Sequence, residues 1–486
     1  MWHAPAPLSR RTIAAGARVL AVAAAAALPL AACKTLSPDG GMEPVAAFAS
    51  HELGKDVTVV RDQEGAEDVR RTVTRLLARP LTADAAVQIA LLNNRGLQAA
   101  YNELGAAEAV MVGASLPPSP TVSLSRLAGS GEIEIERKII GDILALATLP
   151  VRADIAAERF RQAQLRAVGE TLRVAADARR AWYRAVAAEE LAGLLTQAQT
   201  AARTASQLAR RLGETGALNK LDQAREQVFY ADVSTQLAVA RRSAESERER
   251  LIRVLGLWGG ELMFRLARTL PPLPARPRAL PRVEAEAVKR RVDLQIARIE
   301  AAALAKFYGL TQATRFVNLL EVGGQGKTLR KADGEVERQH GVEVEFRIPL
   351  FDFGQVRVRE AEQTYMAAIN RLVERAVQAR SEAREAYRTY RASYDIAMHY
   401  QREVLPLRQI ISDETLLRYN AMQIDVFALL AEARQRLAAM TAAIEARREF
   451  WLADVNLHVA IVGGSPEAAQ SSTVAAAGSG GEGAGH

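Results

Sequence analysis

The sequence predicts a mostly helical protein with a small β part, in which one arrangement of long helices and two strands occurs twice. Three observations support this. No proline occurs between Pro150 and Pro271, where alanine, glutamate, arginine and glutamine, all good helix formers, dominate. Similar segments recur in the same order in both halves of the chain. Between the helical stretches, apolar residues alternate with charged ones, which is the pattern of β-strands.

The repeats come first, because they define the organisation of the chain. Three markers recur in order, and together they indicate a tandem duplication. The markers and their counterparts are 90–100 and 287–297, Leu149-Pro150 and Ile348-Pro349, and 211–222 and 418–429. We therefore expect a first repeat at 81–268 and a second at 282–462. Prolines concentrated between them predict a rigid, extended crossover at 269–281.

Each repeat should contain very long helices. Between 151 and 212, apolar residues recur at steps of three and four, which gives one apolar stripe. At 1.5 Å per residue such a helix is roughly 90 Å long. The stripe is rich in alanine, so neighbouring helices can approach closely and must pack side by side to bury it. A palisade of helices and a plain antiparallel coiled coil both explain this periodicity. Pro406 should interrupt a later helix.

Four strands are expected, two in each repeat. Their predicted limits are 121–127, 132–136, 315–322 and 342–348. A tight turn at 128–131 would join the first two strands, and a long polar loop at 323–340 would join the last two. The segment 137–148 either continues the second strand or forms a short helix.

The charged residues of these strands should lie on one face of a sheet and the apolar residues on the other. A barrel wall between lipid and water has this alternation. Four strands cannot close a barrel, and open edges in lipid leave backbone groups unpaired, at several kcal/mol each. We therefore expect a trimeric, twelve-stranded transmembrane β-barrel. Its lumen would carry Glu132, Glu134, Glu343, Glu345 and Arg347. A soluble sheet packed on the helices is the alternative.

The N-terminus predicts export and a lipid anchor. Residues 1–32 combine three arginines with a short apolar run, as in a secretory signal peptide. Residues 30–33, Leu-Ala-Ala-Cys, resemble a bacterial lipobox, and Cys33 is the only cysteine, so it can form no internal disulfide. We expect Cys33 to carry lipid, including palmitate, and 33–80 to be a lipid-anchored segment. An ordinary signal peptide followed by a chance cysteine is the alternative.

Composition argues against several other classes of protein. Residues 1–32 hold three of the 63 basic and none of the 56 acidic residues, so the remainder has a mild formal net charge of +4. No basic cluster is interleaved with aromatic residues, so we expect no nucleic-acid partner. The six histidines are scattered without metal-ligand spacing, and no nucleophile motif occurs. We therefore expect neither a metal site nor an enzyme.

Together these residues resemble the TolC family of outer-membrane efflux and secretion ducts, in its lipid-anchored branch. The resemblance covers Leu81 to Val462 and rests on the duplicated helices, the turns, and a Pro-Leu-Phe-Asp-Phe-Gly segment at 349–354. It implies a homotrimer in the bacterial outer membrane, with a helical tunnel across the periplasm. A periplasmic adaptor (membrane fusion) protein and an inner-membrane pump would hand substrates to it. A lipid-anchored coiled-coil protein that spaces the envelope without a pore is the alternative.

The resemblance also assigns residues to the periplasmic end. Adaptor-contacting tips would lie at the two helix-helix turns, where Met422 stands in the usual glycine position of the second turn. The tip residues are Gly213, Gly216, Ala217, Leu218, Ala421, Met422 and Gln423. A closing link would join Asp222 to Tyr419. The family's constricting aspartates fall on alanines here, so Asp425 and Glu432 are substitute gate candidates. No cofactor is implied besides lipid on Cys33, and residues 463–486 should be a disordered tail.

Overall fold

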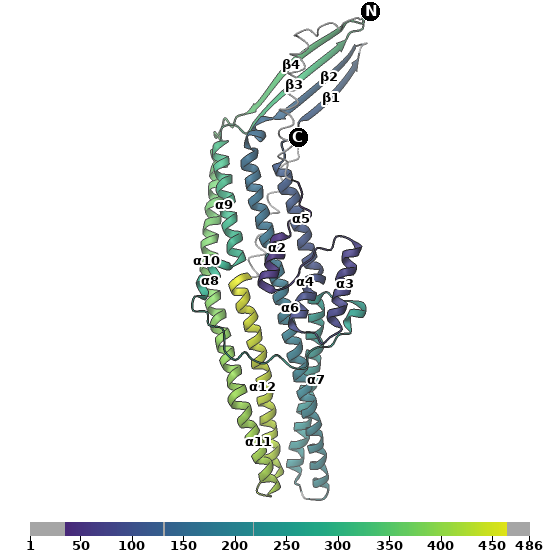
Figure 1. Cartoon of the computed structure of the whole chain (residues 1–486), viewed down its shortest axis with the longest axis vertical. Helices are drawn as coiled ribbons and strands as arrows, with labels where there is room; N and C mark the ends of the chain where they lie inside the picture. Colours follow the sequence, from purple (N-terminus) through teal and green to yellow (C-terminus); the bar gives the residue numbers. More distant parts are fainter. Residues whose placement is uncertain (1–34, 130–131, 217, 464–486) are drawn as a thin grey trace, which may run out of the picture. The chain divides into compact units, whose positions relative to one another are not determined.

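The computed structural model describes residues 35–129, 132–216 and 218–463. The predicted signal peptide, Cys33, Ala217 and the tail from 464 lie outside the described residues. The α-helices are α2 (Glu43–Phe48), α3 (Gln63–Leu77), α4 (Ala83–Asn93), α5 (Arg95–Ser115), α6 (Ile143–Glu214), α7 (Lys220–Leu255), α8 (Val283–Arg290), α9 (Val292–Ala313), α10 (Gln355–His399), α11 (Leu405–Asn420) and α12 (Val426–His458). Short π- or 3-10-helices are η2 (Ala49–Leu53), η3 (Gly259–Leu262), η4 (Tyr400–Val404) and η5 (Val459–Gly463). The strands are β1 (Thr121–Gly129), β2 (Glu132–Asp142), β3 (Leu319–Arg330) and β4 (Val336–Arg347) (Figure 1).

The chain divides into two compact units, and each unit takes segments from both repeats. The first contains 104–162 and 299–369 together with the residues before 42. It holds all four strands. The second contains 42–103, 163–298 and the residues from 370 onwards. It holds the two helix-helix turns and the crossover.

The sheet of the first unit has the order β1-β2-β3-β4, and all neighbours are antiparallel. The segment after 136 contains both of the predicted alternatives in succession. β2 continues to Asp142, and α6 begins at Ile143, where the Asp142 carboxylate accepts a hydrogen bond from the Ala145 N–H at 2.8 Å. The strand therefore leads directly into the long helix.

The predicted long polar loop at 323–340 is wrong. β3 begins at Leu319 rather than Arg315 and runs to Arg330, and β4 begins at Val336, so only 331–335 turn between them. The polar residues and glycines of this segment are typical of a loop. However, β3 pairs with strands on both sides, and at Gly323 a Cβ would approach the Ile139 carbonyl oxygen to 2.9 Å. Close backbone pairing, rather than apolar alternation, makes this segment a strand.

The predicted start of the first long helix at Val151 is also wrong, because α6 includes Pro150. A proline inside a helix removes one backbone hydrogen bond and costs about 3 kcal/mol or more. Pro349, its counterpart in the second repeat, precedes a turn in which Phe353 and Gly354 have φ of 49° and 73°. Pro406 does mark an interruption, because the π-helix η4 lies between α10 and α11 and this proline follows in the first turn of α11.

The duplication is visible as a shared helix break in the second unit. The break between α4 and α5 falls at Asn94, with ψ of 115°, and that between α8 and α9 falls at Arg291, with ψ of 127°. The two positions correspond in the repeat. In the first repeat the Asn94 carbonyl group of the side chain accepts from the Leu97 N–H at 3.0 Å. In the second the Asp293 carboxylate accepts from the Leu294 N–H at 2.8 Å.

Small residues allow the helices of the second unit to pack closely. Ala192 and Leu195 of α6 form a buried cluster with residues of α7, and Leu437 of α12 packs against it. The members from α7 are Leu237, Ala240 and Ala244. α11 and α12 also lie against each other (Figure 1). The alanine-rich stripe is therefore buried between several helices.

The crossover between the repeats is extended and is held by tyrosines of α10. The Tyr390 hydroxyl accepts from the Arg278 N–H at 3.0 Å, and the Tyr394 hydroxyl donates to the Pro274 carbonyl at 3.0 Å. Among the described residues, no helix has an apolar stretch sufficient to span a bilayer.

Candidate functional site

The first helix-helix turn ends in a left-handed residue. Gly216 has φ of 76°, its N–H donates to the Gly213 carbonyl at 3.2 Å, and the Leu218 N–H donates to the Leu212 carbonyl at 3.1 Å. These bonds satisfy carbonyls at the end of α6. At Gly213 a Cβ would come within 2.7 Å of the Gln223 side-chain oxygen, a contact that the flexible glutamine can relieve by moving. Of the two glycines that the resemblance placed at this tip, Gly216 is therefore the one whose backbone conformation favours glycine.

The second turn repeats this geometry without glycine. Met422 has φ of 57° and its N–H donates to the Tyr419 carbonyl at 2.9 Å. The Gln423 N–H donates to the Arg418 carbonyl at 2.9 Å, so this turn also satisfies carbonyls at the end of its helix. The Met422 side chain is 93% exposed. The methionine thus keeps the turn in the conformation that glycine adopts more easily, at some cost in strain.

Asp222, one of the two residues of the predicted closing link, is bonded to neighbours on its own helix turn. The Asp222 carboxylate accepts from the Asn219 amide at 2.6 Å and from Arg225 at 3.0 Å, so it belongs to the first turn of α7. Among the described residues it has no hydrogen bond to Tyr419. Asp425 likewise caps a helix, because its carboxylate accepts from the Ala428 N–H at 2.8 Å.

Glu432, the remaining gate candidate, lies in an interhelical ion pair. Its side chain is 8% exposed and one carboxylate oxygen is 3.2 Å from a guanidinium nitrogen of Arg408, which joins α12 to α11. The other oxygen is buried without a hydrogen bond. The structure thus brings this candidate together with a partner that the sequence analysis did not name.

A second buried glutamate was missed. Glu226 of α7 has a side chain that is 3% exposed, and it accepts from Arg434 of α12 at 2.8 Å. The same guanidinium lies over the Phe229 ring, 4.3 Å from its centroid. A buried charge needs a partner, since its desolvation costs several kcal/mol. A glutamate in register with the apolar positions of α7 was the available signal. This contact links the helix after the first turn to the helix after the second.

The strand register assigns each charged residue to a face of the sheet, because directly paired residues point to the same side. All five residues proposed for the lumen share one face, which we call the carboxylate face. It carries eight carboxylates, on Glu132, Glu134, Glu136, Asp142, Glu321, Glu337, Glu343 and Glu345, and three cationic groups, on Lys138, Lys327 and Arg347. Ion pairs join Lys138 to Glu343 at 2.6 Å and Lys327 to Glu134 at 2.7 Å.

The opposite face, which we call the apolar face, exposes large aliphatic side chains. Val122, Leu124 and Val342 are 71%, 73% and 80% exposed. β1 and β4 also leave one edge each without a strand partner in the described sheet. Exposed apolar surface of this extent marks a site of contact with another molecule or a membrane.

Known structures with this arrangement are outer-membrane channels. The Campylobacter jejuni CmeC outer membrane channel is 15% identical, with a TM-score of 0.66, covering 86% of this chain and 92% of that one. CusC, whose structures concern folding and transmembrane channel formation, is 15% identical, with a TM-score of 0.65. The match covers 79% of this chain and 92% of CusC. The chain has the fold of these outer-membrane channels. This confirms the fold that the resemblance implied.

A sequence relative of this channel-fold chain is also known. The cobalt-zinc-cadmium resistance protein CzcC of Cupriavidus metallidurans is 27% identical over 292 residues, which are 58% of this chain and 66% of the relative. No protein-family model matches the sequence.

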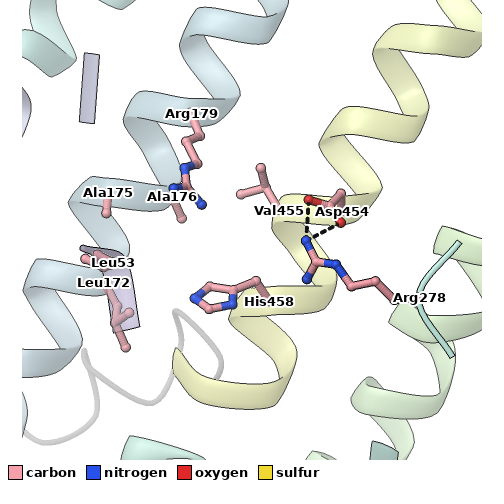
Figure 2. A pocket seen from close by; sticks show the side chains of 9 residues that line it. All are labelled: Leu53, Leu172, Ala175, Ala176, Arg179, Arg278, Asp454, Val455 and His458. Carbon is pink, nitrogen blue, oxygen red and sulfur yellow. Dashed lines mark hydrogen bonds and ion pairs between the residues drawn. The ribbon is translucent and has the colours of Figure 1, made fainter. Parts of the chain in front are cut away.

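A small, largely buried site in the second unit contains His458 (Figure 2). Arg278 of the crossover forms an ion pair with Asp454 of α12 at 2.9 Å, and Arg179 of α6 lies nearby. Burial lowers the pKa of His458 and raises the pKa of Asp454. The His458 Nε2 atom is buried without a hydrogen bond. In the described part of the chain, no three histidine, cysteine, aspartate or glutamate side chains gather as metal ligands.

Proposed function

We propose that the chain is one protomer of a trimeric outer-membrane channel, which exports substrates received from an inner-membrane pump and a periplasmic adaptor. The observation that carries this proposal is the sheet with one carboxylate face, one exposed apolar face and two open edges, in a chain with the fold of such channels. In lipid, open edges must find partners. Three copies would pair their edges and enclose the carboxylate face in a water-filled lumen.

Two measurements test this proposal. The mass of the full-length protein in detergent should correspond to three chains. The same trimers, inserted into planar bilayers, should give reproducible single-channel conductance. A folded protein without conductance would instead support the alternative of a lipid-anchored coiled coil that spaces the envelope.

The lumen should favour cations, because its proposed wall, the carboxylate face, carries eight carboxylates and only three cationic groups. We therefore propose metal cations as cargo, in line with the name of the relative CzcC. Deletion of the gene should lower tolerance to cobalt, zinc and cadmium more than tolerance to detergents or dyes. A strain with equal loss for both classes would contradict this cargo.

The two turns are proposed to contact the adaptor, because each presents a short, ordered reversal between long helices. Gly216 and Met422 occupy equivalent left-handed positions in these turns. Replacing the exposed Met422 with glutamate should weaken adaptor binding without changing the trimer mass. Unchanged affinity for the purified adaptor would exclude this residue from the contact.

The interhelical ion pairs are proposed to hold the periplasmic end closed. We call α6 with α7, and α11 with α12, the two helix pairs. The ion pair of Glu226 and Arg434 joins α7 to α12 and so links the two pairs, and that of Glu432 and Arg408 joins α12 to α11 within one pair. The earlier candidate link between Asp222 and Tyr419 is tested by combining Asp222→Ala with Tyr419→Phe. An unchanged resting conductance would assign closure to the buried pairs alone.

Cys33 is proposed to carry the lipid anchor. Intact-mass measurement should show a mature chain that begins at this cysteine with added acyl groups, and growth with an alkynyl palmitate analogue should label it. The variant Cys33→Ser should lose both signals. Persistent labelling would assign the acyl groups to another residue.

A further inference from the structure

The apolar face of the sheet changes character along its length. Near the strand ends that adjoin the helices it presents aliphatic and aromatic side chains, including Phe346, which is 59% exposed. The neighbouring turn adds Phe351 and Phe353, which are exposed as well. The same face carries four arginines: Arg126, Arg330 and Arg338 lie toward the hairpin ends of the strands, and Arg137 lies in the middle of β2. All four are exposed.

The register arranges these arginines as two pairs. Arg126 of β1 is paired with Ile135, and Arg137 follows two residues later on β2. Arg338 of β4 is paired with Thr328, and Arg330 follows two residues later on β3. Residues in this diagonal relation lie about 7–8 Å apart. Each hairpin therefore brings two guanidinium groups within reach of one ligand.

No carboxylate of the strands shares the face of these arginines, because all eight lie on the carboxylate face. Among the described residues, none of the four arginines has an ion pair. The nearby turn does not supply one either, since Glu335 is bonded to Lys331 at 3.0 Å. Neighbouring like charges without counter-charges are destabilising. The arrangement is therefore suited to an anion from outside the chain.

We propose that the two arginine pairs bind the phosphate groups of a phosphorylated glycolipid, the lipid A type of the outer leaflet. This inference rests on the proposed function, in which the apolar face contacts lipid. Arg338 precedes Phe346 by eight residues, which is about 27 Å along a strand and about 20 Å in height at a tilt near 40°. This height is close to that of the apolar band of an outer-membrane barrel, about 25 Å. Acyl chains would cover the aliphatic part while the phosphates reach the arginines.

The chemistry of the pairs favours a phosphate monoester. Guanidinium groups bind phosphate through two parallel hydrogen bonds, and two arginines match a group with close to two negative charges. The phosphodiester of a phospholipid carries a single charge. We therefore expect the glycolipid with both phosphates to bind more tightly than its dephosphorylated form and than phosphatidylglycerol.

The test uses the full-length trimer in detergent and native mass spectrometry, with lipid A, dephosphorylated lipid A and phosphatidylglycerol as probes. The variants are the pairs R126Q with R137Q and R330Q with R338Q. The matched control is K138Q with K327Q, which removes the same charge from the carboxylate face. We expect each arginine variant to bind lipid A at least about tenfold more weakly and the control to bind it normally.

The outcomes separate this inference from the proposed function. Equal binding of lipid A by all variants, or equal binding of the three probes by the unchanged protein, would overturn the site. Tighter binding of phosphatidylglycerol would overturn the choice of ligand. Conductance is recorded on the same preparations, so a failed channel with phosphate-dependent glycolipid binding would count against the function alone. If a variant does not form trimers, the comparison of the three probes on the unchanged protein decides.

Discussion

Breaking the contact between Glu226 and Arg434 should open the proposed channel. The change is Glu226→Gln, which keeps the shape of the side chain and removes its charge. The glutamate side chain is 3% exposed and lies 2.8 Å from the guanidinium, whereas the Arg434 side chain is 37% exposed, so solvent screens the contact from the arginine side only. The two residues belong to α7 and α12, so the contact ties the two helix pairs to each other.

The expected size of the effect follows from the kind of bond. A hydrogen bond to a charged group contributes about 1.5–3 kcal/mol, and each 1.4 kcal/mol is a factor of ten in an equilibrium. If the closed state contains this bond and the open state lacks it, its complete loss raises the ratio of open to closed channels about 10- to 150-fold. Glu226→Gln removes the charge but keeps an oxygen that can accept from Arg434, so its effect should lie in the lower part of this range. Arg434→Gln should have a similar effect, since it removes the other partner and the contact with the Phe229 ring.

The assay is the resting open probability of single trimers in planar bilayers, for the unchanged protein and each variant. Glu414→Gln is the matched control. The Glu414 carboxylate accepts from Arg418 of the same helix at 3.2 Å, so this substitution removes an equal charge without breaking an interhelical bond. An open probability that is unchanged in Glu226→Gln, or raised equally in the control, would refute the assignment of closure to this contact.

Three further predictions concern stability and are checked on the detergent-solubilised trimer. Met422→Gly should stabilise the protein by about 1 kcal/mol and Gly216→Ala should destabilise it similarly, since both positions are left-handed; a lower unfolding midpoint for the glycine variant would contradict this. The Arg291 side chain is 1% exposed and is bonded twice to Asp293, at 3.0 and 2.8 Å. Changing it to methionine should lower the free energy of unfolding by about 3–5 kcal/mol. Adding Asp293→Ala should restore only part of that loss in denaturant unfolding, because it removes the unpaired buried charge but also the bond to the Leu294 N–H, and Glu382 still lacks Arg291. Because burial lowers the pKa of His458, the unfolded chain takes up a proton first, so stability should fall as pH drops below about 6.5; His458→Gln should lose less stability than the unchanged protein between pH 7.5 and 5.5.

Several features of the fold could be predicted from local pattern. The order of helices and strands in each repeat follows from periods near 3.6 and 2, and both periods are set by backbone geometry alone. The glutamates of β2 and β4 could be assigned to one face for the same reason. The positions of both turns were also predictable, because a glycine at 216 and helix-capping residues such as Asp425 act within a few residues of chain.

Other features depend on neighbours that the local pattern does not contain. β3 is polar and glycine-rich at 323–326, and it is a strand because β2 and β4 supply hydrogen bonds on both sides. The link between Asp222 and Tyr419 stays a prediction, and the local pattern does not contain the bonds that the Asp222 carboxylate accepts from Asn219 and Arg225. The sequence places Glu226 in register with the apolar positions of α7, but only its contact with Arg434 of α12 identifies it as a link.

The sequence by itself therefore determined the duplicated helices, the existence of four strands, the two turns and the division of charge between sheet faces, because these depend on interactions within a few residues. The tertiary structure decided which strands extend, which carboxylates are buried, and which arginines become neighbours on one face. The reason is physical: burial and pairing between distant segments set the cost of an unpartnered charge or backbone group, and that cost is fixed only when the segments meet.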